Sequence, residues 1–115
     1  FRALKLWFVL RHYGLEGLRA HIRRHIAWAA ELTEWVEADD RFKLAAPTVV
    51  SLVCFRHTGG NSATQQVLDA VNQSGRAYLT PTTVNGQLVL RVAIGSPQTE
   101  RQHIEELWNL VQLAA

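Results

Sequence analysis

Residues 77–94, AYLTPTTVNGQLVLRVAI, hold two runs of strand-forming residues on either side of Asn85-Gly86. An Asn-Gly pair tolerates the positive φ angles of a two-residue type I′ turn, so this stretch predicts a β-hairpin. Pro81 has no amide hydrogen to donate, which favours an edge position for the first strand. The second strand is apolar enough to be central, yet it carries Arg91. Because a buried strand rarely accommodates a guanidinium, Arg91 is the first candidate functional residue.

Periodic patterns on both sides of the hairpin predict the remaining elements. The expected helices cover residues 1–13, 15–38, about 62–73 and from 97–99 to the end, and the expected strands cover 42–44, 49–55, 77–84 and 87–94. Gly14 should end the first helix, because glycine adopts a left-handed cap without strain. Two pairs have the spacing of capping boxes, Ser62 with Gln65 and Thr99 with Gln102.

This order of elements predicts an α+β fold. We expect a small, mainly antiparallel sheet of three to four strands with helices packed on one face, preceded by two helices. The second hairpin strand should lie between the other two main strands. The whole chain, 1–115, is expected to form a single domain, with a helical lead-in over 1–38 and a sheet-and-helix lobe over 42–115.

Composition indicates in which cellular compartment the protein functions and whether the chain is complete. The chain contains no methionine and begins inside an amphipathic pattern, so we expect it to be part of a longer protein. The lone Cys54 has no partner for an internal disulfide and is expected to pack as a small apolar residue in the core. The longest apolar run falls well short of the roughly 20 residues that a membrane span requires. These features predict a cytoplasmic protein without membrane contact.

The basic charge gathers at the start of the chain. Residues 1–25 carry six arginines and lysines against the single Glu16, while the net charge of the whole chain is only +2. Such a stretch can bind nucleic acid or another polyanion, or it can form the solvated faces of two helices. The strand LVLRVAI, residues 88–94, has no aromatic side chain on which a base could stack, which argues against RNA. A polyanion-binding module and a ligand-free dimerisation module remain the alternatives.

Other candidate residues indicate structure rather than chemistry. His21 and His25 are four residues apart on one helix, a spacing that zinc can use, but no third ligand is evident, so we predict no metal site. The four tryptophans follow helical spacing and are expected in the core or at an interface, namely Trp7, Trp28, Trp35 and Trp108.

Three segments resemble one known family. They are FRALKLWFVLRHYGLEGLRAHIRRHI at 1–26, SLVCFR at 51–56, and LVLRVAI at 88–94 with the Trp-containing helix that follows. Together they resemble the carboxy-terminal small domain of the aromatic L-amino-acid decarboxylases, which are group II pyridoxal-phosphate-dependent decarboxylases with the aspartate-aminotransferase fold. The resemblance extends over essentially the whole chain. It does not separate tyrosine, tryptophan and DOPA decarboxylases, or decarboxylases from relatives that form aldehydes.

The resemblance implies a parent enzyme that releases CO2 from an aromatic amino acid and leaves the amine, with pyridoxal phosphate as cofactor. It also implies a homodimer and a large domain of the same protein as the partner. In the family, the Schiff-base lysine and the other cofactor-binding residues lie in the large domain, before the start of this chain. Lys5 and Lys43 match no such position. We therefore expect no catalytic, cofactor-binding or metal-binding residue here, and no activity from this chain alone.

Arg91 is the one residue for which the resemblance implies a functional contact. Aminotransferases of this fold use an arginine of the small domain to hold a substrate carboxylate, and glutamate-specific decarboxylases use one on the matching strand. A planar guanidinium suits a carboxylate because it donates two parallel hydrogen bonds. Arg91 is therefore expected either to bind substrate or to pair with a carboxylate of the large domain at the domain interface. Both partners would lie outside this chain.

Overall fold

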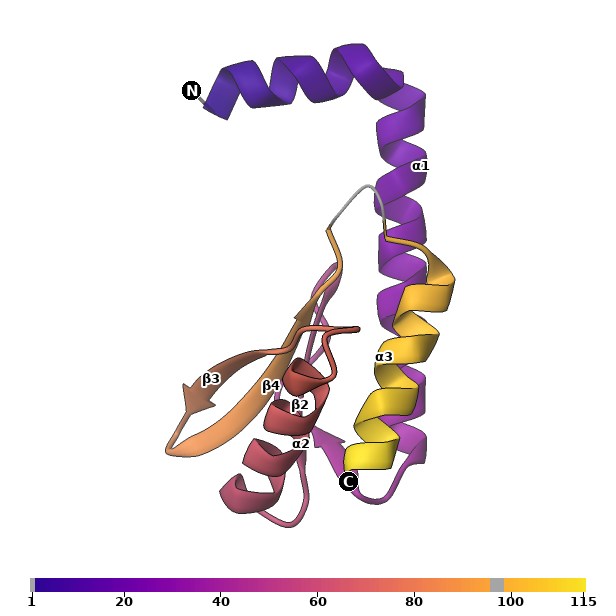
Figure 1. Ribbon diagram of the computed structural model, residues 1–115. Helices are drawn as coiled ribbons and strands as arrows, with labels where there is room; N and C mark the ends of the chain where they lie inside the picture. The colour runs from indigo at the N-terminus through magenta and orange to yellow at the C-terminus, as the bar shows by residue number, and fades with distance from the viewer. Residues whose placement is uncertain (1, 96–98) are drawn as a thin grey trace.

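The computed structural model describes residues 2–95 and 99–115 and contains the expected order of elements (Figure 1). The helices are α1 (Arg2–Ala38), α2 (Asn61–Gln73) and α3 (Arg101–Ala114), and the strands are β1 (Phe42–Leu44), β2 (Leu52–His57), β3 (Thr80–Val84) and β4 (Gln87–Ala93). The α+β prediction is confirmed, including the two helical segments that precede the sheet.

The four strands form one antiparallel sheet in the order β1-β2-β4-β3. Strand β4 is central and β3, which contains Pro81, lies at an edge, as the sequence predicts. The turn between them has φ angles of 52° at Asn85 and 77° at Gly86. These are the left-handed values that a type I′ turn requires, and they explain why an Asn-Gly pair occupies it.

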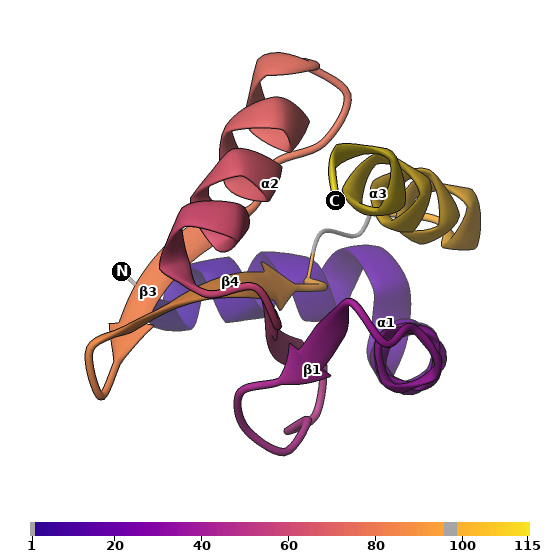
Figure 2. The same cartoon turned by 90° about the horizontal axis from the view of Figure 1, so that it is seen from below.

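All three helices pack on one face of the sheet (Figure 2). Side chains alternate along a strand, so Val53 and Phe55 of β2 and Leu90 and Val92 of β4 point to this covered face. Phe55 is fully buried there. The covered face therefore holds the hydrophobic core, and the opposite face, which we call the outer sheet face, has no helix over it.

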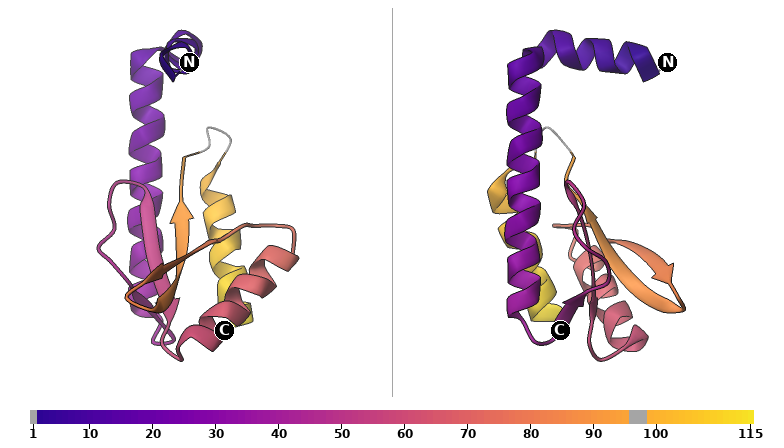
Figure 3. Two further views of the ribbon diagram at one scale, coloured as in Figure 1. Left: turned by 90° about the vertical axis from the view of Figure 1, so that its left-hand side faces the viewer. Right: turned by 180° about the vertical axis from the view of Figure 1, so that it is seen from behind.

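Helix α1 changes direction sharply at Gly14, where φ is 70° and ψ is 169°. Only glycine adopts such values without strain, so the residue separates an N-terminal arm, residues 2–13, from the rest of α1. The arm stands clear of the lobe in the side views (Figures 1 and 3). Its described apolar side chains are exposed, namely Leu4, Leu6, Trp7 and Phe8.

The apolar face of α1 extends beyond the part of the helix that the lobe covers. Ala29 and Val36 are fully buried against the sheet and α3, whereas Ile26 and Ile22, about one and two turns before Ala29, are 40% and 46% exposed. The expected amphipathic helix is present. Its first half presents apolar side chains that the described residues cover only in part.

The first main strand begins later than predicted. The sequence favours a continuous strand over 49–55, but β2 starts at Leu52, and Val50 has a φ angle of 54°. Val49 and Leu52 exchange two main-chain hydrogen bonds of 2.9 and 3.3 Å around a tight turn at Val50-Ser51. A β-branched residue rarely occupies the left-handed region, so the run VVSLV did not reveal this turn.

Neither predicted capping box forms. Helix α2 follows Gly60, which offers no side chain, and the hydroxyl of Thr64 instead donates to the Gly60 carbonyl oxygen over 2.8 Å. Helix α3 begins after Glu100, and the reciprocal cap joins Glu100 to His103, one residue beyond the expected pair. The part of the expected start that falls on residues 97 and 98 lies outside the described residues.

Candidate functional site

Arg91 lies on the outer sheet face. It occupies the central strand, as the sequence predicts, but its neighbours Leu90 and Val92 point to the core while Arg91 points the other way. The side chain is exposed. The guanidinium is therefore not buried by its central position in the sheet. Side chains alternate between the two faces along a strand, so β4 can be central and still hold an exposed arginine.

The outer sheet face carries three cations from three strands. Lys43 of β1 lies directly opposite Arg56 of β2, and Arg91 of β4 lies opposite Cys54, two residues from Arg56. None of the four strands contains an aspartate or glutamate. Among the residues that the structure describes, no ion pair joins Lys43, Arg56 or Arg91 to a carboxylate. The partner expected for Arg91 is thus absent from the described part of the chain.

Cys54 is not in the core, and that prediction is wrong. Its side chain is half-buried on the outer sheet face, between Arg91 on β4 and the edge strand β1. The sequence predicted a core position because the segment 49–55 is apolar almost throughout. Side chains alternate along β2, however, so Val53 and Phe55 point to the covered face and Cys54 points to the outer sheet face.

The lysines do not fit attachment of pyridoxal phosphate. A Schiff-base lysine needs a desolvated pocket that favours the neutral amine. Lys5 is exposed on the N-terminal arm, and Lys43 is exposed at the edge of the outer sheet face. No step of cofactor chemistry can be derived from these two residues.

His21 and His25 lie on one side of α1, with ring centroids 6.2 Å apart. His25 is buried and packs against Trp28, with ring centroids 5.5 Å apart. Over the described ranges, no cluster of three metal-ligating side chains forms around them. Their arrangement fits helix packing better than metal binding.

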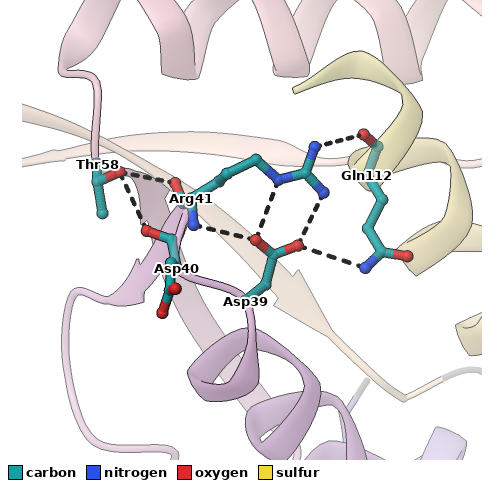
Figure 4. Close-up of polar contacts among 5 residues, drawn as sticks. All are labelled: Asp39, Asp40, Arg41, Thr58 and Gln112. Atoms are coloured by element: carbon teal, nitrogen blue, oxygen red, sulfur yellow. Dashed lines mark hydrogen bonds and ion pairs between the residues drawn. The ribbon is translucent and has the colours of Figure 1, made fainter.

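A polar network joins the ends of α1 and α3 (Figure 4). The Asp39 carboxylate accepts hydrogen bonds from the main-chain amide and the guanidinium of Arg41, at 2.9 to 3.1 Å, and from the Gln112 amide at 3.4 Å. Arg41 also donates to the Gln112 carbonyl oxygen. The side-chain hydrogen bond from Arg41 is the main cause that holds the pKa of Asp39 well below its usual range. Since its groups satisfy one another, the network serves structure rather than ligand binding.

Asp39→Asn is expected to lower the stability of the chain at pH 7, because it removes the ion pair with Arg41. The expected loss is only about 1 kcal/mol, because solvent screens the half-exposed Arg41. Folding lowers the pKa of Asp39, so the contribution of its carboxylate to the free energy of unfolding is complete well above pH 4. It declines as the pH falls below the unfolded value of about 4. Urea unfolding between pH 7 and pH 3 measures the difference. Asp40→Asn is the control, because the exposed Asp40 enters the network only through its main-chain carbonyl; equal curves for both variants would contradict the assignment.

No helix among the described residues has the length and apolar character needed to cross a membrane.

Solved structures identify the class of protein to which this fold corresponds. The chain superimposes on a Catharanthus roseus tryptophan decarboxylase, solved in complex with L-tryptophan, with a TM-score of 0.88 and 41% identity. The match covers 98% of this chain and 25% of that structure. A Rhodiola rosea 4-hydroxyphenylacetaldehyde synthase matches equally well, with a TM-score of 0.89 and 38% identity over 99% of this chain. The kinked helix and four-stranded lobe are therefore a portion of the fold that these enzymes share.

Residues 1–58 match the family described as the pyridoxal-dependent decarboxylase conserved domain, and the chain belongs to this family. An Arabidopsis thaliana phenylacetaldehyde synthase is 43% identical over 119 aligned residues, which cover 97% of this chain. A Drosophila melanogaster aromatic-L-amino-acid decarboxylase is 45% identical over the full chain. The chain spans only about a quarter of the length of these relatives, 24% and 22% respectively. The family resemblance drawn from the sequence is thus confirmed.

Proposed function

We propose that this chain is the small domain of a pyridoxal-phosphate-dependent enzyme that decarboxylates an aromatic amino acid. The observation that carries the proposal is the match to tryptophan decarboxylase, which extends over 98% of this chain at 41% identity. A likeness of this extent supports a shared architecture and a cofactor shared with this family. The amino acid would lose its carboxyl group as CO2 and leave as the amine.

The chain would contribute shape and one cationic group, while the rest of the protein supplies the cofactor site. This division is supported by the exposure of Lys5 and Lys43, neither of which has the surroundings of a Schiff-base lysine. Arg91 would bind either the substrate carboxylate or a carboxylate of the large domain. Its exposed guanidinium on a helix-free face is available to both.

The N-terminal arm would pack against the large domain or a second subunit of a homodimer. Trp7 and Phe8 are more than half exposed on it, and such apolar groups mark an interaction surface when several lie together. We place the enzyme in the cytoplasm and propose neither a nucleic-acid nor a membrane partner. The sheet supports the exclusion of RNA, because no aromatic residue lies on its outer face.

A second candidate reaction is formation of an aldehyde from the same substrates. It is favoured by the 43% identity to a phenylacetaldehyde synthase, which is as high as the identity to a Narcissus pseudonarcissus tyrosine decarboxylase. The part of the protein that chooses between amine and aldehyde would lie outside this chain.

The test uses the full-length protein and this chain side by side. With pyridoxal phosphate, the full-length protein is expected to develop the visible absorbance of an internal aldimine and to release CO2 from tyrosine, tryptophan or DOPA. The chain alone is expected to do neither. Product analysis separates amine from aldehyde. Aldimine absorbance in the chain alone that Lys5→Ala or Lys43→Ala abolishes would contradict the proposal.

A further inference from the structure

We propose that Asn85 is a modification site, where the side-chain amide is converted to aspartate and isoaspartate without the help of an enzyme. The attacking group is the main-chain nitrogen of Gly86, and Asn61 of α2 controls the rate by holding the hairpin turn closed. The reaction needs neither pyridoxal phosphate nor an amino-acid substrate, so it is independent of the proposed function.

The reaction is an intramolecular substitution that consumes water and releases ammonia. The Gly86 nitrogen attacks the Cγ atom of Asn85 and forms a C–N bond. The side-chain nitrogen leaves as ammonia and takes the proton that the Gly86 nitrogen gives up. Water then opens the cyclic imide at either of its carbonyl carbons. Attack at Cγ leaves aspartate, and attack at the main-chain carbon leaves isoaspartate, in which the chain runs through Cβ and Cγ.

Sequence and exposure single out Asn85 among the asparagines of the chain. Glycine follows Asn85, whereas serine, glutamine and leucine follow the others, which are Asn61, Asn72 and Asn109. Because glycine has no Cβ, its nitrogen can approach a neighbouring group closely. Asn85 and Gly86 are both exposed, and their turn projects from the sheet on the side away from α3 (Figures 1 and 2). Water can therefore reach the site.

The closed turn holds the reacting atoms apart. The imide ring can form only when the Gly86 nitrogen lies on the same side of the Cα–C bond of Asn85 as its Cβ atom. The main-chain angles of a type I′ turn place this nitrogen on the opposite side. With φ angles of 52° at Asn85 and 77° at Gly86, the hairpin has that turn. The turn must therefore open before Asn85 reacts, and the contacts that keep it closed control the rate.

Asn61, the first residue of α2, ties the turn to the helix by two hydrogen bonds. Its Nδ2 donates to the Gly86 carbonyl oxygen over 3.1 Å, and its Oδ1 accepts from the Leu88 amide over 2.9 Å. An open cavity of about 520 Å³ lies beside this contact, lined by Asn61, Thr83 and Leu88 together with side chains of α2. Solvent can therefore compete for both hydrogen bonds, and the turn can open while the core of the lobe stays folded.

Strand β3, which leads into the turn, is weakly held. Among the described residues it pairs with β4 alone, Pro81 has no amide hydrogen to donate, and Val84 is 47% exposed. Segments with few buried apolar contacts open most readily. The modification would loosen β3 further. Isoaspartate lengthens the main chain of a two-residue turn by a carbon atom, so Val84 and Gln87 could no longer pair as they do now.

The experiment incubates the full-length protein in neutral buffer and follows the loss of each side-chain amide by mass spectrometry of peptide fragments. Asn85 is expected to lose its amide at least about tenfold faster than Asn72 in the same sample. Asn72 is the internal control, because its side chain exchanges two hydrogen bonds with the main chain of Leu79 and Gln73 follows it within α2. Cleavage by a protease that cuts before aspartate but not before isoaspartate separates the two products, and both are expected.

A variant of α2 tests the control of the rate. Asn61→Ala removes both hydrogen bonds to the turn and leaves Gly60 at the cap of the helix, so Asn85 is expected to react about fivefold faster. The matched control is Gln65→Ala on the same helix, whose side chain donates to Asp69 instead, and its rate should equal that of the wild type. Should Asn61→Ala fail to fold by circular dichroism, Asn61→Asp replaces it. Aspartate still accepts from the Leu88 amide but cannot donate to Gly86, so an increase of at least about twofold is expected.

Three results would overturn the inference. If Asn85 keeps its amide as long as Asn72 does, Asn85 is not a modification site. If aspartate forms without isoaspartate, water hydrolyses the amide directly and the Gly86 nitrogen takes no part. If Asn85 reacts at the same rate in Asn61→Ala and Gln65→Ala, Asn61 does not hold the turn closed.

Discussion

Arg91→Lys in the full-length enzyme is expected to lower kcat/KM for its aromatic amino acid by roughly a hundredfold, the effect of losing a charged bidentate hydrogen bond worth about 2–3 kcal/mol. Lysine keeps the positive charge but presents a single ammonium group in place of a planar fork. The exposed guanidinium has no partner among the described side chains, so the whole effect would report a contact with substrate or with the rest of the protein.

Two further measurements decide which contact Arg91 makes. If it holds the substrate carboxylate, kcat/KM falls while the Tm of the full-length protein stays unchanged. If it pairs with the large domain, the Tm falls and the kinetic effect is smaller. Arg24→Lys and Arg76→Lys serve as controls, because both side chains are exposed away from the outer sheet face. Equal, small effects at all three positions would remove Arg91 from the candidate site.

Phe55→Ala is expected to destabilise the chain by about 3–5 kcal/mol, which is the usual range for removing a buried aromatic ring. Phe55 is fully buried and makes edge-on contacts with Phe42 and Trp108, at ring-centroid distances of 5.8 and 6.1 Å. Its ring packs between β2 and residues of β1 and α3, so the cavity left by the substitution would lie where these three elements meet. Since small domains have total stabilities of about 5–15 kcal/mol, this loss would remove a large share of the free energy of unfolding.

The matched control is Phe8→Ala on the N-terminal arm. Phe8 is 58% exposed, so the same change of side chain should cost less than about 1 kcal/mol in this chain. Urea unfolding followed by circular dichroism measures both variants. Similar losses for Phe55→Ala and Phe8→Ala would show that the core is not centred on Phe55.

Local chemistry explains why most of the fold could be predicted from the sequence. The hairpin depends on two neighbouring residues that tolerate positive φ, Asn85 and Gly86, and the kink in α1 depends on Gly14 alone. Each signal lies within a few residues. The edge position of β3 follows equally directly from Pro81, which cannot donate to a neighbouring strand.

The features that were predicted incorrectly or not predicted have weak or absent local signals. Val50 has a left-handed φ angle that valine normally avoids, so the sequence did not indicate the turn before β2. Cys54 belongs to an unbroken apolar run, and such a run does not indicate which residues face the core. The network between Asp39, Arg41 and Gln112 joins positions more than 70 residues apart, and only the Asp39-Arg41 half of it is local.

The sequence by itself determined the family and the order of helices and strands, and it singled out Arg91 as a candidate, because turn chemistry, periodicity and family motifs depend on adjacent residues. Only the tertiary structure decided that Arg91 shares one face with Lys43 and Arg56. That arrangement depends on the register between β1, β2 and β4. Register is set by packing of the opposite face against the helices, and the residues that bring about this packing are distant in the chain.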